Sequence, residues 1–358
     1  MLRQLNLLRK EPVMKKRTIP CLGLEGLDFV RIMVSCMRGY EPVLIRQLER
    51  ADQVSREAGQ VPHGLPHARE VCSLGLSAGY RIEHLFPGTL FEEDLLVFEA
   101  SGLTHDGARA YGVVDHHKAG GKWVRKYLLG LAKRLFGSSE ICPKWFLNRV
   151  VECVRLHGSE SWLGHRKLSD KAMALLLPSD KFAGSEARLA PEIVEVLRRM
   201  ESIQIPTWLR KKHNLSPKWT PAWVNWNDPD DPAEPALLAD LVQFLEGIGV
   251  VIPTITYDNH DRVNGSIVER SLRFTRDKNP DPTSVIKGSM LLDFQVKEER
   301  APVELVYGLD WWRNALRMHG KAAKVFGLRA RIRINKREIV FNKSMGCWEP
   351  VTVEPMKA

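Results

Sequence analysis

The residues best suited to chemistry lie between positions 113 and 126, in the stretch VVDHHKAGGKWVRK. Asp115, His116 and His117 are adjacent there, and a carboxylate beside two imidazoles offers donor atoms that divalent metal ions bind. Two glycines and a basic segment follow, and exposed glycine N–H groups before a helix can also hold a phosphate. The stretch is therefore a candidate metal or phosphate site. The alternative is a polar loop that leads into a helix, with hydrogen-bonded or solvated histidines.

Downstream residues extend the metal-site hypothesis. The segment NRVVECVRLH places Asn148 and His157 at a spacing that resembles the helical half of a histidine–asparagine–histidine nuclease motif. His116 or His117 would supply the other half, and the resemblance implies a one-metal nuclease. A whole predicted helix separates the halves, however, and no C-x-x-C pair supports them. We therefore expect His157 to lie beyond about 10 Å from both histidines, too far to share a metal held at about 2 Å.

Other catalytic patterns have less support. VVDHH is similar to the Asp-His-His segment of DHH-type phosphoesterases, but the aspartate motif that this family requires on earlier strands is missing. The chain lacks the pattern G-x-x-x-x-G-K-[ST], so nucleotide triphosphatase chemistry is not indicated. Asp293 and Lys297 are interpreted as charges on a strand face. The sequence predicts no bound metal or cofactor, except a divalent ion if the nuclease hypothesis holds.

Charge is the strongest signal for a partner. The chain carries a net charge of +10 and has a pI near 9.3. Residues 118–149 hold eight basic residues against one acidic residue, and residues 321–343 repeat that ratio. Concentrated positive charge of this kind favours a polyanionic partner such as nucleic acid.

Each basic block has a predicted structure. GKWVRKYLLGLAKRLFG has the apolar spacing of a helix, and Gly137 stands where a helix would end. In LRARIRINK, Arg329, Arg331 and Arg333 alternate with apolar residues, which places them on one strand face about 6.5–7 Å apart, a spacing suited to a phosphate backbone. The candidate phosphate contacts are Lys122, Arg125, Lys126, Lys133, Arg134, Arg329, Arg331, Arg333, Lys336 and Arg337.

Residues 205–235 form a tract rich in proline and tryptophan. Its proline density excludes a long helix, while its aromatic content is unlike that of a disordered linker. Trp208, Trp219 and Trp223 are candidates for stacking on the bases of a single strand. The favoured interpretation is that these rings anchor the tract to a neighbouring domain.

The pattern of elements predicts an α+β fold. Residues 1–204 are expected to form a mixed α/β region followed by a helical one, with strands at LDFVRIMVSCMRG and DLLVFEA. Residues 205–235 would cross to a C-terminal part, 236–358, built on an antiparallel sheet and ending in a basic helix and strand. The predicted strands there are VVIPTITYD, GSIVERSLRFTRD, GSMLLDFQVKEE and APVELVYG.

Composition limits the class of protein. No apolar run is long enough to cross a bilayer, the N-terminus lacks the features of a secretory signal, and single scattered cysteines indicate reduced thiols, so a cytoplasmic protein without membrane association is expected. The leading prediction is a non-catalytic DNA- or RNA-binding protein that contacts phosphates, in a nucleoprotein complex of a mobile element or defence system. The alternatives are the metal-dependent nuclease and a protein-interaction module that docks through its Trp-rich tract. Enzymatic activity is not the favoured interpretation.

Overall fold

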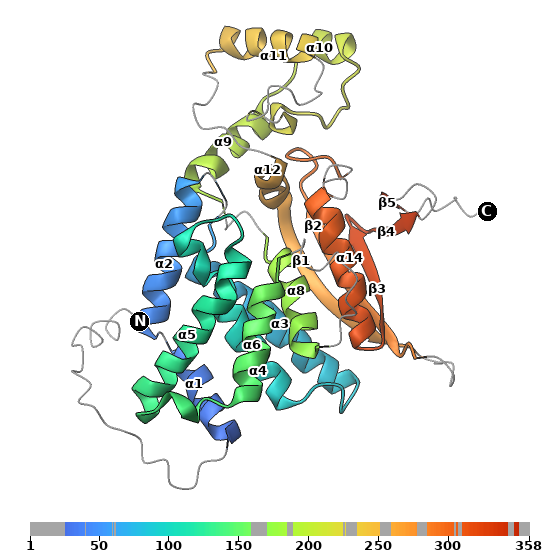
Figure 1. Ribbon diagram of the computed structural model, residues 1–358. Coiled ribbons are helices and arrows are strands. Elements are labelled where there is room, and N and C mark those ends of the chain that lie inside the picture. Colours follow the sequence, from blue (N-terminus) through green and yellow to red (C-terminus); the bar gives the residue numbers. More distant parts are fainter. Residues whose placement is uncertain are drawn as a thin grey trace, which may run out of the picture.

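This computed structural model describes residues 26–39, 41–58, 60, 62–158, 170–184, 189–224, 226, 235–250, 259–277, 285–303, 306, 310–342 and 347–350. Helices dominate its first half and a five-stranded sheet its second, which confirms the α+β class (Figure 1). No described helix is long and apolar enough to cross a membrane. The four cysteines whose side chains are described are free thiols, as predicted, and Cys72, Cys142 and Cys153 are buried.

The described part of the N-terminal region is helical. Its elements are α1 (Gly26–Arg38), α2 (Pro42–Glu57), α3 (Leu65–Leu85), α4 (Glu92–Thr104), the 3-10 turn η1 (Gly107–Tyr111), α5 (His116–Phe136), the 3-10 turn η2 (Ser139–Ile141), α6 (Lys144–Leu156) and α8 (Lys171–Phe182). Gly137 closes α5 with a left-handed backbone (φ 86°), as the sequence predicted.

The two strands predicted before residue 110 are wrong. LDFVRIMVSCMRG lies in α1, where the buried residues Val30, Met33, Val34 and Met37 follow helical spacing. DLLVFEA lies in α4, which is buried on every side because α1, α3, α6 and α8 pack around it. A short, continuously apolar run looks the same in a buried helix as in a buried strand, which explains the error.

The sheet has the order β1-β2-β3-β4-β5. Its strands are β1 (Ile267–Arg276), β2 (Gly288–Val296), β3 (Leu328–Ile334), β4 (Arg337–Asn342) and β5 (Cys347–Pro350). The predicted strands 265–277 and 288–299 correspond to β1 and β2, whereas 250–258 lies almost entirely outside the described residues. Asn335 and Lys336 have positive φ angles, 47° and 67°, and form the two-residue turn between β3 and β4.

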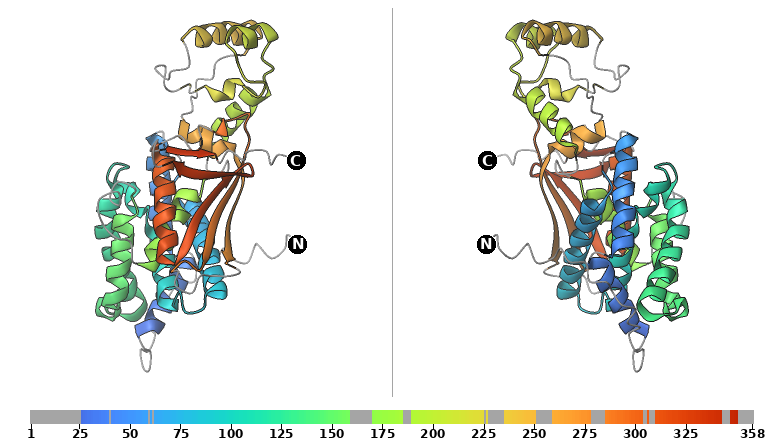
Figure 2. Two further views of the ribbon diagram at one scale, coloured as in Figure 1. Left: turned by 90° about the vertical axis from the view of Figure 1, so that its right-hand side faces the viewer. Right: turned by 90° about the vertical axis from the view of Figure 1, so that its left-hand side faces the viewer.

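The sheet is mixed, not antiparallel as predicted. β2 and β3 run parallel, while the other neighbouring pairs are antiparallel. Parallel neighbours need a long crossover, and α14 (Asp310–Val325) supplies it. The predicted strand 301–308 is helical at its described residues Val303 and Val306. Helices pack on one side of the sheet, with α14 against β3 and α3 against β1 (Figure 2).

A second, smaller core joins the segments around the Trp-rich tract. It contains residues of α9 (Pro191–Ser202), α10 (Thr207–Lys212), the 3-10 turn η4 (Pro221–Trp223) and α11 (Pro235–Gly247). The predicted boundaries after residues 204 and 235 both fall inside this core. It connects to the sheet through α12 (Asn259–Ser266) and through Arg300, a buried residue that forms an ion pair with Glu201 of α9.

Candidate metal centre

A buried group of histidines and aspartates lies where helical segments of the N-terminal half meet. Most of these residues stand at helix ends, where the chain can turn inward. They are His67 in the first turn of α3, His105 and Asp106 directly after α4, His116 at the start of α5, His157 directly after α6, and Asp180 in the last turn of α8.

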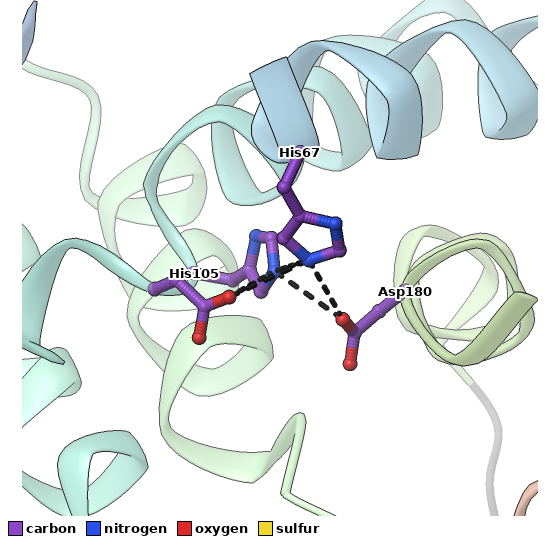
Figure 3. A group of neighbouring side chains, drawn as sticks. His67, His105 and Asp180 are labelled. Carbon is purple, nitrogen blue, oxygen red and sulfur yellow. Dashed lines mark hydrogen bonds and ion pairs between the residues drawn. The ribbon is translucent and has the colours of Figure 1, made fainter. Parts of the chain in front are cut away.

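The deeper part of the group contains His67, His105, Asp106 and Asp180, all buried. His67 Nε2 lies 3.3 Å from His105 Nε2 and 3.3 Å from Asp180 Oδ1. Asp106 Oδ2 lies 3.1 Å from His105 Nε2 and 3.5 Å from His67 Nε2, and Asp180 Oδ1 is 3.4 Å from His105 Nε2. Figure 3 shows the side chains of His67, His105 and Asp180 pointing toward one another.

These spacings suit a metal ion. Four ligands held tetrahedrally at about 2.0–2.2 Å from a cation stand about 3.3–3.6 Å apart. Five of the six separations are given above and range from 3.1 to 3.5 Å. We call these four residues the deep site.

Asp106 presents its other oxygen to a second set of imidazoles. Its Oδ1 lies 3.2 Å from His116 Nε2 and 3.7 Å from His157 Nε2, and those two nitrogens are 3.2 Å apart. The centre of a triangle with these sides lies about 2.0 Å from each corner, which is the length of a bond from a histidine nitrogen to Zn²⁺. We call Asp106, His116 and His157 the open site, because three ligands leave coordination positions for water or substrate.

Backbone carbonyls set the tautomer of three of these histidines. The Nδ1 atoms of His105, His116 and His157 each contact the carbonyl three residues earlier, at 2.8, 2.9 and 2.6 Å. A carbonyl only accepts, so each Nδ1 carries a proton, and in the neutral form of such a ring the lone pair of Nε2 faces the centre. Ligand histidines in metalloproteins are held in the same way by their second nitrogen.

The charges of the group call for a cation. Burial alone would raise the pKa of Asp106, but His105 and Arg109 hold it well below its usual range. Burial likewise opposes ionisation of Asp180, and Lys181 and His105 outweigh it, so the pKa of Asp180 is also low. Burial disfavours the charged form of His105, yet Asp106 and Asp180 raise its pKa to about 10. Two buried carboxylates thus draw a proton onto the cluster, in a position that a divalent ion would fill.

Two observations test whether a metal fits. Asp106 Oδ2 is buried and faces His105 Nε2 at 3.1 Å without a hydrogen bond of good geometry, although buried carboxylate oxygens are normally satisfied. Burial lowers the pKa of His157 to about 4, so this imidazole is neutral and able to act as a ligand at neutral pH. An unsatisfied carboxylate oxygen and inward-facing lone pairs both match a metal ligand set.

A polar cavity of about 340 Å³ opens onto the open site. Asp106, His116, His157 and Asp180 line it, whereas His67 and His105 do not, so the deep site meets the cavity only through its two aspartates. Arg109 and Lys181 also line the cavity and form ion pairs with Asp106 Oδ1 at 2.8 Å and Asp180 Oδ2 at 3.0 Å. The remaining lining residues are His63, Val113, Val114, Asp115, His117 and Gly158.

The structure places the four residues of the nuclease hypothesis differently. His116 and His157 meet with their Nε2 atoms 3.2 Å apart, so the expected separation beyond 10 Å is wrong. His117 lines the same cavity, with its ring centroid 6.3 Å from that of His157. Asn148 lies apart from this group on the exposed side of α6, where it accepts a hydrogen bond from Arg125 at 3.2 Å.

Sequence reasoning missed His67, His105, Asp106 and Asp180. The overlooked signal was the His105–Asp106 pair, which follows the apolar run of α4 just as His157 follows that of α6. The strand interpretation of residues 94–100 concealed it, because a strand end at residue 100 would leave the pair in a loop. Asp115 is exposed, forms an ion pair with Lys118, and belongs to neither metal site.

The predicted phosphate contacts divide into exposed and neutralised groups. Lys122, Arg125, Lys126 and Lys133 are exposed on α5, as are Lys336 on the β3–β4 turn and Arg337 at the start of β4. Arg134 forms an ion pair with Glu41, Arg331 with Glu338 and Arg333 with Asp293. Of the three strand arginines, Arg329 alone forms no ion pair with a described carboxylate, so the β3 face is less cationic than its sequence suggested. Asp293 is thus a paired strand-face charge, as interpreted.

The tryptophans are used mostly for packing. Trp219 is 7% exposed in the second core, and Trp223 donates its indole N–H to the carbonyl of Glu298 at 2.6 Å. Stacking on a base needs an accessible ring, so the stacking hypothesis is wrong for Trp219 in this conformation. Trp208 is 53% exposed and retains an accessible ring.

Comparison with known proteins found no matching protein family, no matching curated protein and no matching solved structure.

Proposed function

We propose that this protein is a metal-dependent hydrolase that acts on phosphoesters. The observation that carries the proposal is the position of Asp106, whose two carboxylate oxygens each face a separate set of histidine nitrogens. A carboxylate shared in this way would bridge two cations. Two-metal sites with ions about 3.5–4 Å apart are common in phosphatases and nucleases, where the ions stabilise the attacking and leaving oxygens.

The chemistry is hydrolysis and needs no redox partner. Oxygen from water bonds to phosphorus as the bond from phosphorus to the leaving oxygen breaks. One proton leaves the water and one is taken up by the leaving oxygen. A bound divalent ion lowers the pKa of water, and His63 and His117 on the cavity wall are in position to carry protons.

Charge around the cavity supports an anionic substrate. Asp106 and Asp180 contribute two negative charges, and Arg109 and Lys181 balance them on the same wall. Divalent ions would then make the loaded site positive, which favours a phosphate group over a neutral ester or amide. Mixed imidazole and carboxylate ligands favour Mn²⁺, Fe²⁺ or Zn²⁺ over Ca²⁺.

The test is a metal-loading and hydrolysis experiment. Purified protein is stripped with a chelator, reloaded with Mn²⁺, Fe²⁺ or Zn²⁺, and assayed for bound metal and for cleavage of bis(p-nitrophenyl) phosphate. Wild type is expected to bind metal and to cleave in its presence. His116→Ala should reduce cleavage by at least about 100-fold, because it removes a ligand of the open site.

Asn148→Ala separates this proposal from the histidine–asparagine–histidine nuclease. Asn148 contacts Arg125 and neither metal site, so its loss should leave metal content and cleavage unchanged. A large loss of cleavage in Asn148→Ala would favour the one-metal nuclease instead. A protein that binds no divalent metal after reloading would overturn both.

Binding of DNA or RNA stays a proposal, supported by the exposed basic residues of α5. Membership of a nucleoprotein complex and docking through the Trp-rich tract remain predictions from the sequence.

A further inference from the structure

The exposed basic residues of α5 lie along one side of the helix. At 100° per residue, Lys118, Lys122, Arg125, Lys126 and Lys133 fall within an arc of about 100°, and they span a length of about 22 Å. All five are exposed. We call them the α5 ridge. Its length matches about six phosphates of a nucleic-acid strand, which are spaced about 3.4 Å apart along a duplex axis.

The α5 ridge begins at the mouth of the candidate active site. His116, the first residue of α5, belongs to the open site, and His117 lines the same cavity. The rest of α5 runs away from the cavity as one helix (Figure 1). A strand bound along the ridge would therefore be held in a defined direction relative to the cavity.

The positive charge of the ridge is largely uncompensated. Lys118 pairs with Asp115, but no described carboxylate forms a salt bridge with the other three lysines, and Arg125 contacts the neutral Asn148. On β3, by contrast, Arg331 and Arg333 are paired with carboxylates. Uncompensated cations release more counterions when they meet phosphates, so α5 is the better phosphate-binding surface.

A membrane surface is the competing partner for a basic amphipathic helix, and the packing of α5 disfavours it. Binding in the interface of a bilayer requires a free apolar face. The apolar face of α5 is already buried in the protein core, through Val124, Tyr127, Leu128 and Leu131. The surface left over is polar and cationic, which fits a solvated phosphodiester backbone.

From these observations we propose that the substrate is a polynucleotide, bound along the α5 ridge and directed into the cavity at His116. The proposal rests on the proposed hydrolase function for its catalytic part, while the binding part stands by itself.

The test compares two triple variants of equal charge. Lys122→Gln/Lys126→Gln/Lys133→Gln removes three cations from the ridge, and Arg329→Gln/Lys336→Gln/Arg337→Gln removes three exposed cations from the sheet. Both are measured with fluorescent single-stranded DNA, single-stranded RNA and duplex DNA over a series of salt concentrations. Circular dichroism melts check that both variants are folded. Hydrolysis of an oligonucleotide and of bis(p-nitrophenyl) phosphate is followed with metal-loaded protein.

The ridge variant is expected to lose at least about tenfold in affinity for one or more of these polynucleotides at low salt. The slope of log affinity against log salt should fall by about 2–3, because three phosphate contacts are lost. Its KM for the oligonucleotide should rise, with cleavage of the small diester unchanged. The sheet variant should behave like wild type in each assay.

Equal losses in the two variants would show a general charge effect and overturn the proposal. Polynucleotide binding that does not depend on salt would also overturn it. A ridge variant that loses binding to phosphatidylserine vesicles but keeps binding to polynucleotides would do the same. If no phosphoester is cleaved but the ridge variant alone loses polynucleotide affinity, the hydrolase function is wrong and polynucleotide binding along the α5 ridge is supported. If the small diester is cleaved and no polynucleotide binds, binding along the α5 ridge is wrong and the hydrolase function is supported.

Discussion

Replacing Asp106 with asparagine is the sharpest test of the metal centre. The Asp106→Asn substitution keeps the shape of the side chain but removes the charge that both metal sites share. Changes to outer-shell residues of metal sites cost about 10–100-fold in affinity, so loss of a shared ligand should cost at least about 100-fold. By mass action, a 100-fold weaker Kd lowers metal-dependent stabilisation by about 3 kcal/mol when metal is in excess over both values of Kd.

The assay is thermal unfolding with and without metal. For a chain of 358 residues, about 3 kcal/mol corresponds to a difference of about 4 °C in the metal-induced shift of Tm, because the entropy of unfolding is about 2.1 cal/mol/K per residue. Bound metal is counted by mass spectrometry on the same samples. Asp115→Asn is the matched control, because Asp115 also lines the cavity but belongs to neither site. Equal metal-induced shifts in wild type and Asp106→Asn, or an equal loss in Asp115→Asn, would refute the assignment.

Three further predictions concern stability outside the site. Burial lowers the pKa of His319 to about 4, below the unfolded value of 6.5, so its protonation favours unfolding. The free energy of unfolding of wild type should fall by about 3 kcal/mol through this group as pH falls from 6.5 toward 4, and that of His319→Gln should fall less. Parallel denaturant titrations across that pH range check this, and identical pH profiles would contradict it. A Cβ on Gly75 would collide with the ring of Phe98, so Gly75→Ala should lower the free energy of unfolding by about 1–3 kcal/mol. A Cβ on Gly320, inside α14, meets no atom within 4 Å, so Gly320→Ala should instead stabilise the protein by about 0.5–1 kcal/mol. Thermal melts that shift the Tm of both glycine variants in the same direction would count against this packing.

Some of the candidate site could be inferred from the sequence. His116, His117 and His157 stood out by residue type alone, and the structure places all three around one cavity. Asn148 entered the hypothesis only through its spacing from His157. Asn148 lies nine positions before His157, which is two and a half helical turns, so it lies on the opposite side of α6 and contacts Arg125 instead.

The sequence by itself determined the charge of the chain and part of its local structure. Apolar spacing determined α5 and its end at Gly137, period-two alternation determined β3, and composition determined the basic balance of the chain. These are local properties, because side chains three or four residues apart share a helix face and side chains two apart share a strand face. The parallel pairing of β2 with β3 was not of this kind, since it depends on where α14 returns the chain.

Only the tertiary structure decided the ligand set and the free surfaces. Asp106 meets His67 from α3, His157 from the end of α6 and Asp180 from α8 only once these helices have packed around α4. Spacing along the chain carries no record of that approach. Pairing also decided which cations are free, because Arg331 meets Glu338 across the β3–β4 hairpin while Lys122 meets no described carboxylate. Burial then gave the histidines and aspartates their chemistry, because charged groups withdrawn from water must be neutralised by a partner, a proton or a metal ion.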